Sequence, residues 1–266
     1  MNSQAPARRS HRSALPWLAA SVLAAGLLIS AQHASAAPTG AAACPAPASA
    51  IGLSKAWKLQ LPLPNSSGSP LEVKQPALAT YDKAPWFTTT SGCDAIKFRA
   101  AVNGATTSNT GYPRSELREM TANGSGNAGW SSTDGTHTMV VDEAVTHLPA
   151  GKPHVMAGQI HDATSDVTSF RLEGSSLYVT SYNTPHYKLV TSNYQLGDRF
   201  QGKFVVHDGK VDVYYKGTLQ ATIAADFSSG YFKAGAYTQA NCDNSAPCNT
   251  SNYGEVSLYD VTVTHS

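Results

Sequence analysis

Hydrophobic and polar positions alternate along most of the chain in short runs, and no segment of useful length has the spacing of an amphipathic helix. Val211, Val213 and Tyr215, for example, alternate with Asp212 and Tyr214. Such alternation is typical of strands that bury one face, and turn residues separate the runs. Strands are predicted at residues 95–102, 114–120, 137–145, 154–162, 168–173, 176–182, 200–207, 210–215, 218–224, 231–239 and 255–264.

Two pairs of turn residues predict tight hairpins between these strands. Asp208-Gly209 and Gly174-Ser175 are of the types that tolerate the positive φ angles of two-residue turns. We therefore expect an all-β domain of antiparallel sheets packed face to face. The sequence shows no internal repeat and no second domain.

The first 36 residues have the organisation of a secretory signal peptide. Arg8, Arg9 and Arg12 precede an apolar run at 15–29, and residues 34–36 offer a small-residue cleavage site. A membrane anchor is the alternative, but the run is short and ends in a cleavage-type sequence. We therefore predict a secreted, extracellular protein that is not membrane-bound after cleavage. The export route stays open, because the paired arginines also allow twin-arginine export.

Cleavage would leave a flexible lead-in at residues 37–50, rich in Ala, Pro and Thr, followed by one domain at residues 51–266. The whole chain has 19 basic and 18 acidic residues, and the signal peptide contains three arginines and no acid, so the mature chain is close to neutral. A nearly neutral domain lacks the basic surface that nucleic acid requires. Any site that binds an anion must therefore be a local cluster of basic side chains.

Four cysteines, an even number in an exported chain, predict disulfide bonds. Three pairings are possible. The short separation of Cys242 and Cys248, with turn residues between them, favours a stapled loop and would leave Cys44 to pair with Cys93. A zinc site is the alternative, but the cysteine spacings are not those of zinc fingers or ribbons, and we expect no metal.

Three stretches far apart in the sequence place reactive polar side chains two residues apart. Residues i and i+2 of a strand share one face, so each stretch would turn its polar set to one side of a sheet. A solvated outer face could show the same alternation, but Arg, His, Lys and Tyr together favour a groove that binds an anion. The side chains are Arg114, Glu116 and Arg118, then Gln159 and His161, then Tyr231, Lys233, Tyr237 and Gln239.

These stretches also carry a family resemblance. WKLQLP at 57–62, YPRSELREM at 112–120, QIH at 159–161, YFKAGAYTQ at 231–239 and VSLYDVTVTH at 256–265 resemble the alginate lyases of polysaccharide lyase family 7. The resemblance runs from about residue 51 to the end. It implies a β-jelly roll, a concanavalin-like sandwich of two curved antiparallel sheets. Its concave face would bind alginate or a related anionic polysaccharide and cleave it by β-elimination without a cofactor. We expect the domain to be a monomer.

β-Elimination at a 4-linked uronate requires three functions: a group that stabilises the C6 carboxylate, a base for the C5 proton and an acid for the leaving O4 oxygen. The family motifs assign the first function to Arg114 and Gln159, since a guanidinium matches a planar carboxylate. The candidates for proton transfer are His161 and Tyr237. In the lyases that the chain resembles, the motif tyrosine is the acid and also the base for mannuronate, so His161 would be the base for guluronate.

The other motif residues are expected to bind substrate. Arg118 and Lys233 would contact neighbouring carboxylates, and Tyr231 and Gln239 would line the groove. Glu116, between two arginines, suits an ion-pair role that orients them better than it suits acid catalysis. The remaining histidines, among them His137, His147, His154, His186 and His207, are expected to be surface or packing residues.

Ile160, the middle residue of the QIH motif, is associated in this family with guluronate-containing alginate, and a strand would point it away from its two neighbours. We therefore expect a preference for guluronate or mixed blocks, with a related uronate such as glucuronan as the alternative. Residues 103–110 and 184–196 are predicted to be loops that could close an end of the groove.

Two other classes of function are possible on a β-sandwich. A binding module or lectin would depend on exposed aromatic residues or calcium rather than on Arg, Gln, His and Tyr together. A glycoside hydrolase needs two carboxylates roughly 5 to 10 Å apart across the bond. Glu116 and Glu119, being three residues apart, should face opposite sides of a strand.

Overall fold

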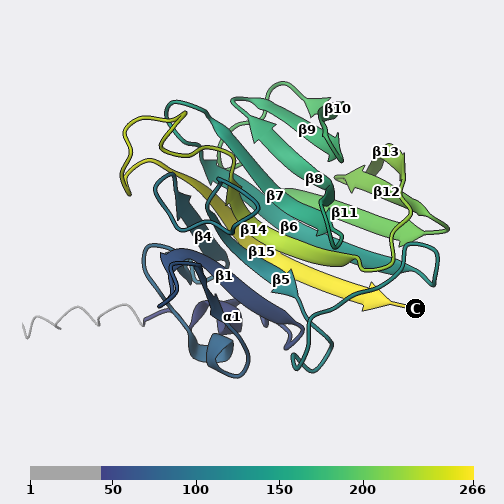
Figure 1. Cartoon of the computed structure of the whole chain (residues 1–266), viewed down its shortest axis with the longest axis horizontal. Coiled ribbons are helices and arrows are strands. Elements are labelled where there is room, and N and C mark those ends of the chain that lie inside the picture. The colour runs from purple at the N-terminus through teal and green to yellow at the C-terminus, as the bar shows by residue number, and fades with distance from the viewer. Residues whose placement is uncertain (1–42) are drawn as a thin grey trace, which may run out of the picture. The chain divides into compact units, whose positions relative to one another are not determined.

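Two antiparallel sheets make up the domain in this computed structural model, which describes residues 43–266 (Figure 1). The predicted signal peptide lies outside the described residues. The first sheet has eight strands, in the order β10 (Thr184–Thr191), β9 (Ser176–Ser181), β8 (Asp166–Glu173), β7 (His154–His161), β14 (Tyr231–Thr238), β5 (Arg114–Glu119), β1 (Trp57–Pro64) and β2 (Pro70–Val73). The second has seven, in the order β13 (Thr218–Ala224), β12 (Lys210–Tyr215), β11 (Phe200–His207), β6 (His137–His147), β15 (Tyr253–His265), β4 (Ile96–Ala101) and β3 (Phe87–Thr89).

The predicted all-β jelly roll is confirmed. Its two C-terminal strands take inner positions, β14 between β7 and β5 in one sheet and β15 between β6 and β4 in the other. The only helical elements described in residues 43–266 are two single turns, α1 (Pro47–Ala50) and η1 (Ala77–Thr80). No helix in this range is long and apolar enough to cross a bilayer.

The core lies between the sheets, where strand alternation puts it. On β14, Phe232, Ala234 and Ala236 are buried in the core, whereas Lys233 and Tyr237 alternate with them and line a pocket on the other face. Removing such apolar surface from water contributes about 25 cal/mol per Å². The inner strands are therefore held rigidly, which fixes the direction of the polar side chains between the apolar ones.

All the strands predicted from alternation form, and those at 200–207, 210–215 and 218–224 match residue for residue. β1, β2, β3 and β10 were missed, and the prediction of a loop at 184–196 was wrong because residues 184–191 form β10. β10 is an edge strand with mostly exposed side chains and contains Pro185, so it has no buried face to produce alternation. β1 is buried at five of its eight positions, including the successive residues Trp57, Lys58 and Leu59, which also hides alternation.

The preferred disulfide pairing is confirmed: Cys44 bonds to Cys93, and Cys242 bonds to Cys248. The first bond anchors the described part of the predicted lead-in. Residues 47–50 form a helical turn there, and Thr89 donates a hydrogen bond to the Pro45 carbonyl. From residue 43 onward this segment is therefore attached to the sandwich rather than free.

A change of alternation in β7 decides which of its side chains face outward. Val155, Ala157 and Ile160 are in the core, so the inward positions are first two and then three residues apart. The pairing of β7 with β8 is irregular between Ala157 and Gln159, which marks a bulge at Gly158. Because of this extra residue, Met156 and Gln159 lie on the same outer face.

Glu143 on β6 lies directly beneath this bulge. A Cβ atom on Gly158 would come within 3.2 Å of the Glu143 carboxyl oxygen, a tight contact that glycine avoids. Glu143 is completely buried, its carboxyl oxygens have no hydrogen-bond partner among the described residues, and burial raises its pKa to about 8. The core thus contains a carboxyl group that is neutral at pH 7.

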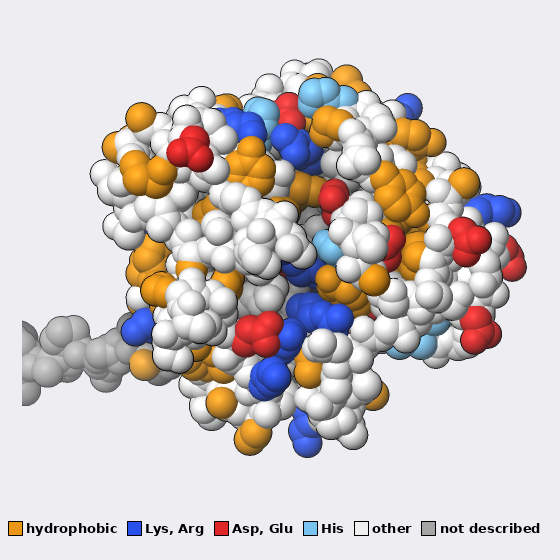
Figure 2. Space-filling view, viewed as in Figure 1, with side chains coloured by type: hydrophobic (Ala, Val, Ile, Leu, Met, Phe, Trp, Pro, Cys, Tyr) orange, Lys and Arg blue, Asp and Glu red, His pale blue; other side chains and the backbone are white. Residues whose placement is uncertain are grey.

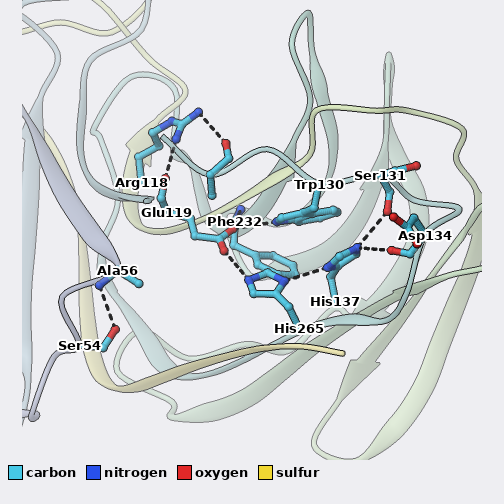
Figure 3. Close-up of polar contacts among 11 residues, drawn as sticks. Ser54, Ala56, Arg118, Glu119, Trp130, Ser131, Asp134, His137, Phe232 and His265 are labelled. Carbon is cyan, nitrogen blue, oxygen red and sulfur yellow. Dashed lines mark hydrogen bonds and ion pairs between the residues drawn. The ribbon is translucent and has the colours of Figure 1, made fainter. Parts of the chain in front are cut away.

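Glu119 faces the opposite side of β5 from Glu116, as the strand spacing predicts. Its carboxylate accepts hydrogen bonds from the indole of Trp130 at 3.0 Å and from the backbone of Phe232 at 2.9 Å, and it contacts His265 Nε2 at 2.7 Å (Figure 3). Three strands, β5, β14 and β15, are joined at this carboxylate.

His137 is a member of the same network, and it is a packing residue, as expected, because it is buried and its ring stacks on Trp130. Its Nε2 lies 3.0 Å from the Ser131 carbonyl and 2.9 Å from that of Asp134, and its Nδ1 lies 2.8 Å from Nδ1 of His265 (Figure 3). Both Nε2 atoms face acceptors and must carry hydrogen. The two rings thus connect the Glu119 carboxylate to the carbonyls of Ser131 and Asp134.

Glu143→Gln should remove a pH dependence of stability. The folded state retains the Glu143 proton up to about pH 8, whereas an unfolded glutamate loses it near 4.5. The contribution of this carboxyl group to the free energy of unfolding is therefore complete below pH 4.5. It falls by up to about 1.4 kcal/mol for each pH unit above that, and is lost once the pH has risen through about 8. Denaturant unfolding between pH 5 and 9 should show the glutamine variant gaining stability relative to wild type as the pH rises.

Asp260→Asn is the control, because Asp260 is an exposed carboxylate of the same sheet. It should leave the pH profile unchanged. A stability difference between Glu143→Gln and wild type that stays constant over this range would contradict the buried, protonated state of Glu143.

Candidate active site

Polar side chains on four adjacent strands form one row across the outer face of the eight-stranded sheet. Gln159 on β7 pairs with Lys233 on β14, which pairs with Arg118 on β5, which pairs with Lys58 on β1. Figure 2 shows Lys and Arg side chains gathered along a hollow near the middle of the molecule. The predicted groove with a cationic centre is therefore a feature of this face.

This row lies in a pocket of about 420 Å³, here called the central pocket. All four residues predicted to be catalytic line it, and so do Arg118, Tyr231 and Lys233. Glu116 and Gln239 do not. The other lining residues are Lys58, Gln60, Thr107, Asn109, Thr110, Ala163, Thr164, Ser165 and Asp166.

Arg114 and Tyr237 are paired across β5 and β14 at one side of the central pocket. The guanidinium carbon lies 3.9 Å from the centre of the tyrosine ring, a cation–π contact that holds both side chains. The Tyr237 hydroxyl donates to the Thr110 hydroxyl at 3.0 Å. The loop that carries Thr110 therefore fixes the direction of the phenol.

His161 is held from two sides. Its Nδ1 donates to the Asp162 carbonyl at 2.6 Å, and its ring stacks on Tyr231 with 5.2 Å between centroids. Burial lowers the pKa of His161 and nearby Lys233 lowers it further, whereas the bond to the Asp162 carbonyl opposes the shift. The imidazole is thus neutral near pH 7, with its proton on Nδ1 and a lone pair on Nε2 that can accept one.

Glu116 occupies a different place from the one predicted. It is completely buried and does not line the pocket, so it cannot be a substrate-binding residue by direct contact. Its carboxylate forms an ion pair with Lys233 Nζ at 2.5 Å, accepts a short hydrogen bond from the Gln159 amide and lies 3.8 Å from Arg114 Nη1. Glu116 therefore positions Arg114, Lys233 and Gln159 from below. Of the two arginines that it was expected to orient it reaches only Arg114, because Arg118 donates to the carbonyls of Glu119 and Ala128.

Lys233 is nearly as buried as its partner, with 2% of its surface exposed. Burial lowers the pKa of Lys233 to about 8, Arg114 lowers it as well, and Glu116 opposes the shift. Gln159 uses its amide nitrogen for Glu116, and its Oε1 has no partner among the described residues. The pocket floor is thus preorganised for a polar ligand.

Arg118 and Tyr231 form the other side of the pocket. The Arg118 guanidinium lies 3.9 Å from the centre of the Tyr231 ring and donates to the carbonyls of Glu119 and Ala128. Burial lowers the pKa of Arg118 and raises that of Tyr231. These contacts hold a cation above the sheet where a second acidic group could bind.

Gln239 lies apart from the central pocket, in an adjoining hollow beyond Tyr237. Sequence reasoning missed Lys58, Gln60 and Thr110. Lys58 and Gln60 had a readable signal, because they are two residues apart in the WKLQLP motif. Thr110 had none, since a loop residue is placed by the path of the chain.

A metal centre is not formed by the side chains described. Among residues 43–266, no group of three or more His, Cys, Asp and Glu side chains is arranged to hold a metal ion.

Comparison with known proteins identifies the family to which these residues belong. Residues 51–265 match the family model of the alginate lyases. The chain belongs to the alginate lyase family. The match covers most of the chain and includes all the motifs quoted above.

Solved structures of family members resemble the chain over the described domain. An alginate lyase from Corynebacterium sp. is 59% identical and superposes with a TM-score of 0.81, covering 84% of this chain and 99% of that one. AlgAT5, an alginate lyase of polysaccharide lyase family 7, is 42% identical with a TM-score of 0.77, covering 83% and 99%. An alginate lyase of Klebsiella pneumoniae is 40% identical over 85 residues, which is 31% of this chain and 27% of that protein.

Glu116→Gln should destabilise the fold by about 3–5 kcal/mol, because it leaves the Lys233 ammonium buried without a counter-charge. Because Glu116 raises the pKa of Lys233, its loss lowers that pKa further, so the loss of stability should shrink as the pH rises towards about 8. Denaturant unfolding at pH 7 and pH 9 measures both effects.

Asp142→Asn is the matched control. Asp142 pairs with Arg199 at 2.6 Å, but the Arg199 side chain is 52% exposed, so the loss of this carboxylate should cost no more than about 1 kcal/mol. Equal costs for the two variants would show that Glu116 is not the buried anchor described.

Proposed function

We propose that the chain is an alginate lyase that cleaves its substrate by β-elimination in the central pocket. The observation that carries this proposal is the convergence of Arg114, Gln159, His161 and Tyr237 on one pocket from three adjacent strands. Together they supply the carboxylate binder, the base and the acid that elimination requires.

The charge of the central pocket supports a polyuronate substrate. Four cationic side chains line it, those of Lys58, Arg114, Arg118 and Lys233. Among the described residues, Asp166 is the one carboxylate that lines it. In relatives 27% identical to this chain, variants of the family 7 alginate lyase A1-II′ were solved with a product, GGG, and with a substrate, GGMG. An oligosaccharide of this kind, with one carboxylate on each sugar, matches several cations along one groove.

Arg114 and Gln159 would hold the C6 carboxylate of the sugar that loses its proton. The Arg114 guanidinium is fixed by Tyr237 and by Glu116, so its unused N–H groups have a set direction. Gln159 gives one of its two amide hydrogens to Glu116 and keeps the other for the substrate. As negative charge builds up on the carboxylate, both donors stabilise it without moving.

His161 and Tyr237 would carry out the proton transfers. The free Nε2 lone pair of neutral His161 suits it as the base that removes the C5 proton of guluronate. The Tyr237 hydroxyl, which donates to Thr110 in the free protein, would instead donate to the leaving O4 oxygen. For mannuronate, where the C5 proton lies on the other face of the sugar, Tyr237 would act as the phenolate, take the C5 proton and pass that proton to the leaving O4 oxygen.

The substrate preference that we propose is guluronate or mixed alginate. Ile160, the residue on which it rests, is completely buried in the core on the opposite side of β7 from the pocket. Its effect would therefore come through packing that shifts Gln159 and His161. A related uronate such as glucuronan is the alternative, whereas family membership does not favour a module that only binds. Secretion is proposed from the first 36 residues.

Tyr237→Phe should lower kcat at least about 100-fold, since general acid–base catalysis contributes about 10²–10⁴. The ring keeps its contact with Arg114, so KM should change little. The rate of ultraviolet absorbance increase on alginate, which reports the new conjugated double bond, is the measurement.

Tyr231→Phe is the control, because Tyr231 lines the same pocket and stacks on His161 without a proposed proton transfer. It should retain most of the activity. Near-normal turnover of Tyr237→Phe on every alginate block would overturn the assigned role.

A further inference from the structure

A second hollow adjoins the central pocket on the far side of Tyr237, here called the distal hollow. It has a volume of about 270 Å³ and shares Tyr237 and Asp166 with the central pocket. Tyr112, Arg171 and Gln239 are among the residues that line it. A chain-like ligand that passes Tyr237 therefore enters this hollow next.

Gln239 is the polar group in the distal hollow with unused bonding capacity. Only 6% of its surface is exposed, and its Nε2 has no partner among the described residues. Its Oε1 accepts a hydrogen bond from Arg171 Nη1 at 3.2 Å. Because a guanidinium can only donate, this bond fixes the orientation of the amide and leaves Nε2 as the donor for a ligand.

Arg171 is itself fixed by two other neighbours. Its Nε donates to Glu173 at 2.5 Å, and its Nη2 donates to His154 Nδ1 at 3.1 Å. Burial lowers the pKa of His154, and Arg171 and Lys152 lower it further against the opposing effect of Glu173, so this histidine can accept the bond as a neutral ring. Three of the five N–H donors of the guanidinium are thus used.

The distal hollow differs in charge from the central pocket. Asp166 lines both, but Arg171 is the one cation among the described residues that line the distal hollow and it is paired with Glu173, whereas four cations line the central pocket. A carboxylate gains little in such a place. Sugar hydroxyl and ring oxygens, which need donors without net charge, fit the Gln239 amide, and the rings of Tyr112 and Tyr182 offer apolar surface to a pyranose.

We propose that the distal hollow is a sugar subsite that binds one residue of the polysaccharide through its hydroxyl oxygens, with Gln239 as the donor and Arg171 as the residue that positions Gln239. This subsite rests on the proposed function, because its ligand is the same chain that is cleaved beside Tyr237. Arg171 acts through Gln239 and takes no part in the proton transfers.

Arg171→Met tests the proposal, since methionine keeps much of the side-chain length but donates no hydrogen bond. The amide of Gln239 would then rotate freely. For alginate oligosaccharides long enough to reach the distal hollow, KM should rise about tenfold with kcat unchanged, a loss equivalent to about 1.4 kcal/mol. Oligosaccharides too short to reach it should show no change.

Two further variants separate positioning from loss of folding. Arg171→Lys retains a donor for Gln239 and should recover part of the affinity for long oligosaccharides. Gln239→Leu should reproduce the loss, and the double variant with Arg171→Met should be no worse than either single one. Thermal unfolding of each variant shows whether the fold is intact.

Binding measured without cleavage distinguishes failure of the subsite from failure of the function. In a Tyr237→Phe background, calorimetry with a long alginate oligosaccharide should show about tenfold weaker binding when Arg171→Met is added. If wild type cleaves alginate but this substitution changes neither KM nor Kd at any length, the subsite is refuted. If wild type cleaves no polyuronate, the proposed function fails, and unchanged binding would refute the subsite as well.

Salt dependence tests the kind of contact. The effect of Arg171→Met on KM should be the same at low and high ionic strength, because hydroxyl recognition is not screened. The effect of Lys58→Ala, which removes a cation of the central pocket, should shrink as salt is added. If the effect of Arg171→Met disappears at high salt, the hollow binds a carboxylate, and the proposal of hydroxyl recognition is wrong.

Discussion

The groove depends on one buried carboxylate. Glu116 lies beneath the outer face of the eight-stranded sheet and is completely buried. Its carboxylate contacts three side chains of the pocket, those of Lys233, Gln159 and Arg114. A buried carboxylate is costly unless its charge is matched. The surrounding donors match it, and in doing so each is held in a single orientation. Because β5 lies beside β14 and β14 beside β7, the same contacts also hold the pocket residues in register across the sheet. Substrate carboxylates therefore meet donors that need no rearrangement.

Much of this arrangement could be predicted from the sequence, because strand period and side-chain direction are linked. The spacing in YPRSELREM, GQIH and YFKAGAYTQ correctly indicated three strands with polar outer faces, and the four proposed catalytic residues converge on one pocket. Their proximity could not follow from spacing alone, since nothing local determines which strands pair. That they share one concave face came from resemblance to a family, and the order of the strands came from the structure. The pairing of Cys242 with Cys248 followed from their short separation, and the structure confirms it.

Other features of the fold and of the pocket could not be predicted from the sequence, and the physical reason differs from residue to residue. Glu116 was expected in the groove because alternation shows the face of a strand but not the depth of a side chain. The bulge at Gly158 changes the alternation of β7, and the side chain that lies against it, the buried carboxyl of Glu143, comes from the other sheet. Thr110 reaches Tyr237 from a loop, where no period applies. β10 has no buried face, so its sequence resembles that of a loop.

The central claim is that the central pocket breaks a uronate chain by elimination and does not merely bind it. Ultraviolet absorbance of the purified mature chain, in the presence of a chelator, tests it most directly against separate polyguluronate, polymannuronate, mixed alginate and glucuronan. Elimination leaves a conjugated double bond that hydrolysis does not produce. We expect absorbance to rise on alginate, and fastest on blocks that contain guluronate. If absorbance rises on none of the four while binding to any of them is retained, the account is contradicted and the protein is a binding module.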